Sequence, residues 1–347
     1  MTTTLRFGIA GLDHWYSAIP FAQALASDDR VELVGIAHSD VDRARAVAAE
    51  VGSPTVTDSV EELIDDPAID VLVSFVSVDQ NPRVCIAAAN AGKHIVATKP
   101  LARTLAEADE VVMAVQRAGV VFIPGESRAR ASDLGQLLAD WVQSGRLGRI
   151  TSGSFTLSGS LPQSWPGEED AGWWVDPART PGGGWVDHSI YQLDRMRWLL
   201  GEEVTQVSGR VGNHVHQELA VEDYGHATVT FSGGATFSME DTWTAPMNGS
   251  RTSMSLVGTA GAVSWDSATG FISLTDKSGP FEGWVHSKAP SDNAVGIESM
   301  LAAYADPSRA IATVLDGWNN LAACLAFYES SASGGSAFEP ARFSRGH

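Results

Sequence analysis

The chain has little cysteine and a shortage of positive charge. Two of its 347 residues are cysteines, Cys85 and Cys324, which lie far apart in apolar stretches with helical patterning. This predicts two buried free thiols in a reducing, cytoplasmic compartment. Acidic residues number 42 against 23 basic ones, and the formal net charge is -19 at pH 7. Nucleic acid and anionic membrane surfaces are excluded as main partners, because both require a basic patch.

Long hydrophobic runs are missing too. We find no apolar run of about twenty residues, the length that a membrane-spanning helix needs. The N-terminal stretch MTTTLRFGIAGLD lacks a charged region followed by a long apolar one. The sequence therefore predicts neither a membrane span nor an export signal. A content of 44% apolar and 19% charged residues is ordinary for a globular chain of this length with two full cores.

Short apolar runs alternate with helical patterns over residues 1–125. This alternation predicts an α/β fold, a doubly wound Rossmann domain whose ligands bind at the carboxyl ends of the strands. The expected strands are Leu5–Ala10, Val31–Ala37, Asp70–Val76, His94–Ala97 and Val120–Pro124. The expected helices between them include Val41–Val51, Asn81–Ala91 and Thr104–Ala118.

The pattern changes in residues 126–347. Period-two runs predict an α+β domain with a large, mostly antiparallel open sheet, to which the last helix packs back. The expected strands are Ile150–Ser158, Thr205–Val211, His226–Phe231, Ala235–Thr242, Ser253–Val257 and Ala262–Trp265, and the expected helices are Ala129–Gln143, Trp185–Leu200 and Pro307–Ser330.

Glycine is scarce where a dinucleotide-binding loop requires it. In GIAGLDHWY, residues 8–16, only the first glycine of a G-x-G-x-x-G fingerprint is present, as Gly11. Asp13 and Tyr16 replace the other two, and Asp13 is expected to cap the first helix and to weaken nucleotide binding. The expected cofactor contacts in this segment are Gly8, Gly11, Leu12, Asp13 and His14.

The acidic residue that usually ends the second strand is also missing. His38 stands there, followed by Ser39, Asp40 and, one turn later, Arg43. Ser39 and Arg43 suit a 2′-phosphate, whereas Asp40 opposes it, so NAD and NADP both remain open. Ser77 and Gln80, after the fourth expected strand, are further candidate cofactor contacts.

Lysine is rare, and one of the four lysines stands at a chemically important place. Lys99 follows the strand His94–Ala97 and precedes Pro100, so its ammonium group should enter the ligand crevice. The surrounding stretch GKHIVATKPLARTLAEADEVV resembles the Gfo/Idh/MocA family of NAD(P)-dependent sugar and polyol oxidoreductases. The resemblance extends through RLGRI at 146–150, the GGG-x-x-D helix, the GTAGAV turn and the final helix.

The resemblance implies specific roles. Lys99 and Pro100 would lie beside the nicotinamide, with Lys99 next to the reacting hydroxyl; the glutamate that usually precedes the lysine is Thr98 here. The open sheet would be buried in a homodimer or homotetramer. On the helix in GGGWVDHSIYQLDRMRW, the family pairs an aspartate with a histidine four residues later. Asp187 keeps its place, and Tyr191 replaces the histidine.

The spacing on this helix puts Asp187, Tyr191, Asp194 and Trp198 on one face. A phenol is a poor base at neutral pH unless a cation stabilises its phenolate, and Lys99 would supply that cation. His188 is the alternative base, but its position is rotated by about 100° from Asp187. We favour Tyr191 and keep His188 open.

Aromatic and histidine residues add further candidates. Trp165 and Trp174, in a tryptophan-rich loop before the helix, would offer flat faces to a sugar ring, and Arg128 would contact substrate or cofactor. His214 and His216 resemble metal ligands on one strand face, but no further ligand fixes a geometry, and we expect no metal.

The sequence thus predicts hydride transfer between a nicotinamide and a secondary hydroxyl or ketone of a sugar, inositol or related glycoside. The alternative is a non-catalytic regulatory protein that binds a nucleotide or sugar on the same fold.

Overall fold

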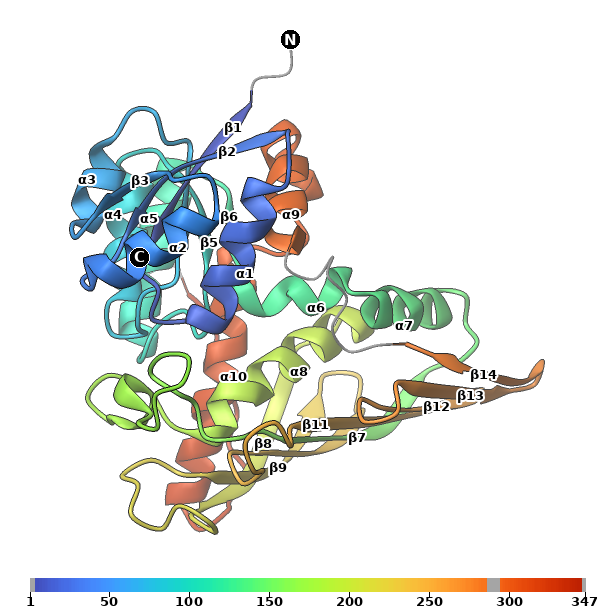
Figure 1. The fold of residues 1–347 in the computed structure, drawn as a ribbon. Coiled ribbons are helices and arrows are strands. Elements are labelled where there is room, and N and C mark those ends of the chain that lie inside the picture. Colours follow the sequence, from blue (N-terminus) through green and yellow to red (C-terminus); the bar gives the residue numbers. More distant parts are fainter. Residues whose placement is uncertain (1–3, 286–293, 345–347) are drawn as a thin grey trace. The chain divides into compact units, whose positions relative to one another are not determined.

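The structure, a computed structural model, describes residues 4–285 and 294–344. The chain divides into two compact units (Figure 1). Unit 1 consists of Met1–Arg128, Ser164–Glu168 and Pro290–Trp318. Unit 2 consists of Ala129–Gln163, Glu169–Ala289 and Asn319–His347.

A six-stranded parallel sheet forms the centre of unit 1, in the order β3-β2-β1-β4-β5-β6. The order reverses between β1 and β4, as in a doubly wound Rossmann sheet, and this confirms the expected fold class. The strands are β1 (Leu5–Ala10), β2 (Val31–Ala37), β3 (Thr55–Thr57), β4 (Val71–Ser74), β5 (His94–Ala97) and β6 (Phe122–Pro124).

Helices cover the sheet of unit 1. Their ends follow local chemistry: Thr104 caps α5 by accepting a hydrogen bond from the Glu107 N–H, and Gly119 ends that helix at φ 67°. The helices are α1 (Trp15–Ala26), α2 (Val41–Glu50), α3 (Val60–Asp65), α4 (Asn81–Asn90), α5 (Leu105–Ala118) and α9 (Val295–Ala305).

Helix α9 was not expected from the sequence, although it belongs to the core of unit 1. Ile297, Met300 and Ala303 are fully buried there with residues of α1 and the sheet. Gly296 lies so close to Phe21 that an added Cβ would approach Phe21 Cε2 to 2.8 Å. The C-terminal half of the sequence therefore contributes a helix to the nucleotide-type domain.

Unit 2 contains an eight-stranded sheet in the order β14-β13-β12-β11-β7-β10-β9-β8. All neighbouring pairs are antiparallel except β7 and β10, which confirms a mostly antiparallel sheet. The strands are β7 (Ile150–Ser158), β8 (Val204–Gly212), β9 (Tyr224–Phe231), β10 (Thr236–Thr242), β11 (Arg251–Gly258), β12 (Gly261–Asp266), β13 (Phe271–Asp276) and β14 (Gly279–Trp284).

One face of this sheet holds the core of unit 2, formed with α7 (Asp133–Gln143), α8 (Gly184–Leu200) and the C-terminal part of α10 (Val314–Ala332). The single helix expected at Ala129–Gln143 is divided into α6 (Arg128–Ala131) and α7. The division lies at Ser132, whose hydroxyl caps α7 by accepting a hydrogen bond from Gly135 N. The expected helix Pro307–Ser330 likewise begins as a 3-10 turn at Pro307–Arg309 before α10.

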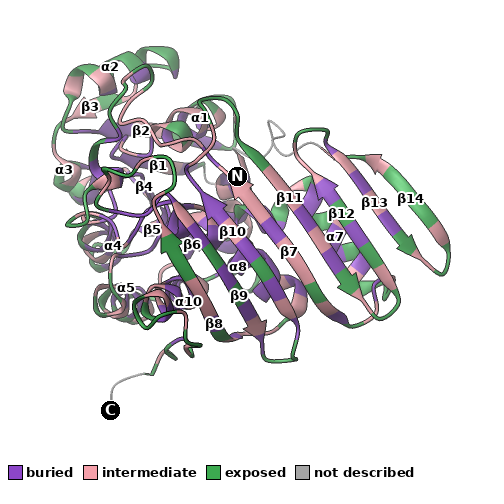
Figure 2. Ribbon diagram, turned by 90° about the horizontal axis from the view of Figure 1, so that it is seen from below, coloured by how far each residue is buried: buried purple, intermediate pink, exposed green. Residues whose placement is uncertain are grey.

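The other face of the sheet carries polar side chains. Hydroxyl pairs link neighbouring strands, with Ser154 Oγ 2.8 Å from Ser255 Oγ and Ser264 Oγ 2.9 Å from Ser273 Oγ. Along β9, β12 and β13 buried residues alternate with more exposed ones, and Figure 2 shows this alternation as bands. The two faces therefore differ sharply in polarity.

One helical segment, Pro307–Ala332, is long and apolar enough to span a membrane by length and composition. In the structure 61% of its most apolar window is buried, as in core helices of globular proteins, which pass the same test.

Candidate active site

The loop after β1 has the conformation of a tight strand-to-helix turn. Gly11 has φ +81°, and an added Cβ there would lie 2.6 Å from Val76 Cγ1. Gly11 is therefore required by the backbone itself. Gly8, by contrast, lies inside β1, where an added Cβ would meet Ile69 Cδ1 at 2.7 Å, so close packing explains that glycine.

Asp13 does not cap α1, contrary to the sequence prediction. The N-cap is His14, which makes no side-chain capping bond and is fully buried. The Asp13 carboxylate instead accepts a hydrogen bond from Ser77 N at 3.2 Å, which connects this loop to the segment after β4. The prediction failed because the backbone turn places the N-cap one residue later.

This loop suits a dinucleotide. The glycine turn leads into the twelve-residue helix α1, whose N-terminal end carries the positive end of the helix dipole and whose first turn contains no acidic residue. Leu12 N donates a hydrogen bond to His38 Nδ1 at 3.3 Å, so the loop and the end of β2 are held together. The residues present therefore fit the phosphates of a nicotinamide cofactor.

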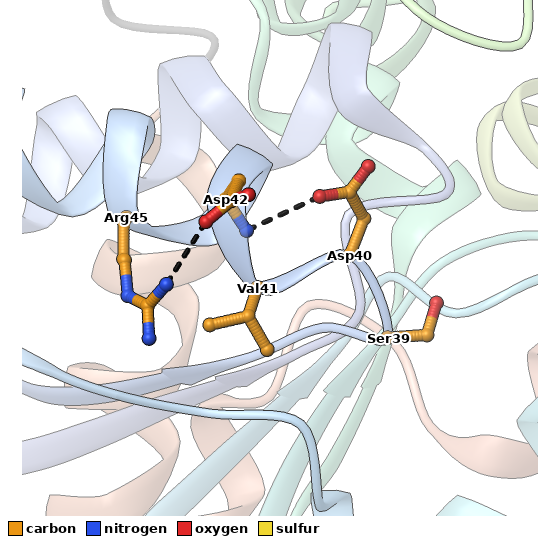
Figure 3. Close-up of a pocket in the computed structure, with 5 residues that line it drawn as sticks. All are labelled: Ser39, Asp40, Val41, Asp42 and Arg45. Atoms are coloured by element: carbon orange, nitrogen blue, oxygen red, sulfur yellow. Dashed lines mark hydrogen bonds and ion pairs between the residues drawn. The ribbon is translucent and has the colours of Figure 1, made fainter.

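An open hollow with a volume of about 630 Å³ follows β2 (Figure 3). It is lined by Ser39, Asp40, Val41, Asp42 and Arg45. Asp40 caps α2 by accepting hydrogen bonds from the Asp42 and Arg43 N–H groups. Burial lowers the pKa of the adjacent His38, which favours its neutral imidazole.

The turn that carries Lys99 is held by hydrogen bonds of a buried side-chain amide, that of Asn81. Ser74 Oγ donates to Asn81 Oδ1 at 2.8 Å, and Asn81 Nδ2 donates to the Leu101 carbonyl at 2.9 Å. Lys99 itself is 2% exposed. Asn81 was not singled out from the sequence, although its place at the start of an expected helix after β4 is a usable signal.

A buried glutamate, Glu222, contacts the N-terminus of helix α8. Glu222 Oε1 accepts hydrogen bonds from Gly183 N at 2.9 Å, Trp185 N at 3.2 Å and Tyr328 Oη at 2.8 Å. Glu222 thereby satisfies N–H groups that the helix start leaves without partners. Asp187 lies in the first turn that Glu222 holds in place.

Asp187 is the centre of a polar cluster in unit 2. Trp243 Nε1 donates to Asp187 Oδ2 at 3.0 Å, and His188 Nε2 lies 3.2 Å from the same oxygen. The rotation between positions 187 and 188 therefore does not keep the two side chains apart. A histidine oriented by a carboxylate is an arrangement suited to general acid–base chemistry.

The other members of the predicted helix face, Tyr191, Asp194 and Trp198, contact residues of the interior of unit 2. Asp194 is fully buried and pairs with Arg130 at 2.6 Å, and Asn320 Nδ2 donates to it at 2.9 Å. Tyr191 and Trp198 are partly buried against the core of unit 2. The predicted face therefore includes a structural ion pair as well as candidate site residues.

A further acid, Asp241 of β10, is missing from the sequence prediction. It is fully buried, and neither carboxyl oxygen has a hydrogen-bond partner among the described residues. Burial, with smaller contributions from the Asp187 and Glu240 charges, raises its pKa well above the ordinary value. Its inward register, shared with Phe237 and Met239, could have revealed it.

This raised pKa predicts a pH-dependent stability. The folded chain binds the Asp241 proton more tightly than the unfolded chain, so stability falls as pH rises from 3.8, the ordinary value, towards the folded pKa. Asp241→Asn removes this loss. We compare the free energy of unfolding of Asp241→Asn with that of wild type. The difference, variant minus wild type, should increase by about 1 kcal/mol or more between about pH 4 and pH 8.

Urea unfolding at both pH values measures this difference. Asp29→Asn, at an exposed position, is the matched control and should show no comparable growth. A gain for Asp241→Asn that is the same at both pH values would show that Asp241 is ionised in the folded protein.

The loop aromatic residues take different positions. Trp174 is 4% exposed and stacks on Trp173 with ring centroids 4.0 Å apart, and Trp185 stacks on Phe327 at the same distance. Trp165 belongs to unit 1, where it stacks on His38. Arg128, also in unit 1, is exposed and donates to Ser17 Oγ at 3.4 Å.

The two candidate metal-ligand histidines do not lie on a strand, which corrects the sequence prediction. Strand β8 ends at Gly212, and the backbone N–H groups of His214 and His216 donate to the Asp223 carboxylate at 2.8 and 2.7 Å. Asp223 thus folds this segment into a loop. Over residues 4–285 and 294–344, no group of three or more metal-ligating side chains is found.

The fold and these groups define a class of protein. A Rossmann unit with a buried lysine at a strand end, joined in sequence to an α+β unit with an aspartate–histidine pair, is the architecture of a two-domain nicotinamide-dependent oxidoreductase.

Family models specify the class further. The model described as "Oxidoreductase family, NAD-binding Rossmann fold" matches residues 5–126, and the one described as "GFO/IDH/MocA C-terminal domain" matches residues 136–264. The chain belongs to the Gfo/Idh/MocA family of oxidoreductases, and its first domain is an NAD-binding Rossmann fold.

Individual relatives act on sugars and inositols, by their names. The chain is 28% identical over 315 residues to a 1,5-anhydro-D-fructose reductase of Ensifer adhaerens, covering 87% of this chain and 90% of the reductase. It is 28% identical over 225 residues to a scyllo-inositol 2-dehydrogenase (NAD(+)) of Bacillus subtilis, covering 64% and 62%. A levoglucosan dehydrogenase in complex with NADH shares the fold, with a TM-score of 0.84, 20% identity and coverage of 98% and 100%.

Proposed function

We propose that this protein transfers a hydride between a nicotinamide cofactor and a secondary hydroxyl, or the matching ketone, of a sugar, inositol or related glycoside. The observation that carries the proposal is the buried Lys99 at the carboxyl end of β5, in a chain of an oxidoreductase family. The names of the relatives support the substrate class.

Oxidation of an alcohol removes a hydride from carbon and a proton from oxygen. The nicotinamide supplies the hydride acceptor. Lys99 binds and polarises the substrate oxygen through its ammonium group, and Tyr191 removes the proton from that oxygen. The pair of His188 and Asp187 binds neighbouring hydroxyls and orients the ring; His188 is the alternative base.

The remaining contacts fall into two groups. Arg128, Trp165 and Trp174 are proposed substrate contacts beyond Lys99 and the helix residues. The proposed cofactor contacts are Gly8, Gly11, Leu12, Asp13, His14, His38, Ser39, Arg43, Ser77, Gln80, Lys99 and Pro100.

We assign nucleotide binding to residues 1–125 and substrate binding and self-association to residues 126–347. A second copy would cover the hydroxyl-rich face of the eight-stranded sheet, giving a homodimer or homotetramer, which light scattering would detect. Two free, buried thiols suit a reducing compartment, and we propose the cytoplasm.

A dehydrogenase screen tests the function. Sugars, inositols and glycosides are offered with NAD or NADP, and absorbance of the reduced nicotinamide is recorded in both directions. We expect turnover of at least one member of this substrate class. Inactivity with every member, together with tight binding of nucleotide or sugar, would instead establish the non-catalytic regulatory function.

A further inference from the structure

A five-residue segment that follows β7 in the sequence packs beside the end of β2. This strap, Ser164–Glu168, belongs to unit 1, although the residues on either side of it belong to unit 2. Trp165 lies against the core of unit 1 and stacks on His38, with ring centroids 6.3 Å apart and an interplanar angle of 16°. The strap therefore lies next to the open hollow after β2, whose lining starts with Ser39 and Asp40.

The strap also engages Arg43, the candidate cation for a 2′-phosphate. The guanidinium carbon of Arg43 lies 4.6 Å from the centre of the Trp165 ring, and its Nη2 pairs with Glu168 Oε1. Ser164 Oγ donates to the other Glu168 oxygen at 2.6 Å and so orients the carboxylate. Asp40 adds a second ion pair with Arg43 at 3.1 Å.

We propose that the strap Ser164–Glu168 makes this site selective for NAD over NADP by holding Arg43 in an ion pair with Glu168. The inference rests on the proposed function, since it assumes that a nicotinamide dinucleotide binds here. It concerns a specificity determinant contributed by a distant part of the sequence.

The electrostatic argument is simple. A 2′-phosphate brings additional negative charge and needs a cationic donor, ideally an arginine fork. Arg43 already faces two carboxylates, Asp40 occupies the N-terminus of α2, and burial of His38 disfavours a positive charge on its imidazole. A 2′-hydroxyl requires no such cation, so NAD meets no comparable penalty.

Calorimetric titration of the full chain with NAD and with NADP tests the inference without an activity assay. Glu168→Gln removes the charge that holds Arg43 and keeps the side-chain shape. The pair is partly exposed, so we expect a moderate gain of about fivefold in NADP affinity, with NAD affinity nearly unchanged. Glu169→Gln, which removes the same charge at an exposed neighbouring position, should change neither affinity.

Two further variants extend the test, and the first of them does not depend on how Glu168→Gln folds. Arg43→Gln alone should leave the preference for NAD intact, and Glu168→Gln combined with Arg43→Gln should lose the gain. A wild type that prefers NADP, an unchanged affinity ratio in a folded Glu168→Gln, or a loss of NADP binding in Arg43→Gln would overturn the inference. Binding of neither nucleotide by wild type would contradict the proposed function itself.

Discussion

Lys99→Met is expected to lower kcat by about a thousandfold, while the protein still folds and still binds its dinucleotide. The effect is large because the ammonium group acts on the reacting oxygen itself, where general acid–base assistance contributes about a hundredfold to ten-thousandfold and one electrostatic donor about a hundredfold to a thousandfold. Methionine has a similar length and suits the buried position, which is 2% exposed. Turnover of the substrate found in the screen and calorimetric binding of the dinucleotide measure the two properties.

Lys277→Met is the matched control, because Lys277 is an exposed lysine of unit 2. It should retain wild-type turnover. If Lys99→Met keeps more than about a tenth of the wild-type kcat, Lys99 has no role in the chemical step.

Tyr191→Phe is expected to lower kcat by about a hundredfold and to leave KM nearly unchanged, because it removes one hydroxyl group that acts on the proton in the transition state. His188→Gln is expected to have a smaller effect on kcat and a larger one on KM. This difference follows from assigning proton removal to Tyr191, which leaves the His188–Asp187 pair to bind neighbouring hydroxyls. Steady-state kinetics of both variants across pH separates the two roles.

Tyr304→Phe, on the exposed side of α9, is the control for loss of a phenol hydroxyl. A larger loss of kcat in His188→Gln than in Tyr191→Phe would assign the base to His188. If His188→Gln abolishes turnover and Tyr191→Phe does not, His188 removes the proton and Asp187 orients it.

Periodicity predicted the elements with strong local signals. Strands β1, β2, β5 and β7 have the predicted bounds, because each is a run of apolar or alternating residues bounded by polar turns. The start of α8 differs from the prediction by one residue. These segments carry most of the candidate site, so the strand-end position of Lys99 and the helix position of Asp187 could be inferred.

Elements stabilised mainly by tertiary contacts were missed. Strand β3 has three residues, too few for a period, and β13 and β14 extend a sheet edge with mixed polarity. Helix α9 is apolar on several sides, and only its packing in the core of unit 1 explains it. The break between α6 and α7 depends on one capping serine, which the apolar pattern does not show.

The polar contacts of the site were the least predictable part. Asp13 binds Ser77, Asp194 binds Arg130, and Glu222 holds the start of α8. Each of these contacts joins residues about 40 or more positions apart in the sequence, so no local pattern reports them. Trp165 was predicted to face a sugar, and the ring contacts that the structure shows for it are with His38 and Arg43.

A crystal structure of the protein with NADH and a ketone product tests the central claim most directly. The account predicts that Lys99 Nζ, Tyr191 Oη and nicotinamide C4 each lie within about 4 Å of the reacting carbonyl group. A nicotinamide ring bound away from Lys99, or a Tyr191 hydroxyl that faces a different compartment from the lysine, would contradict it.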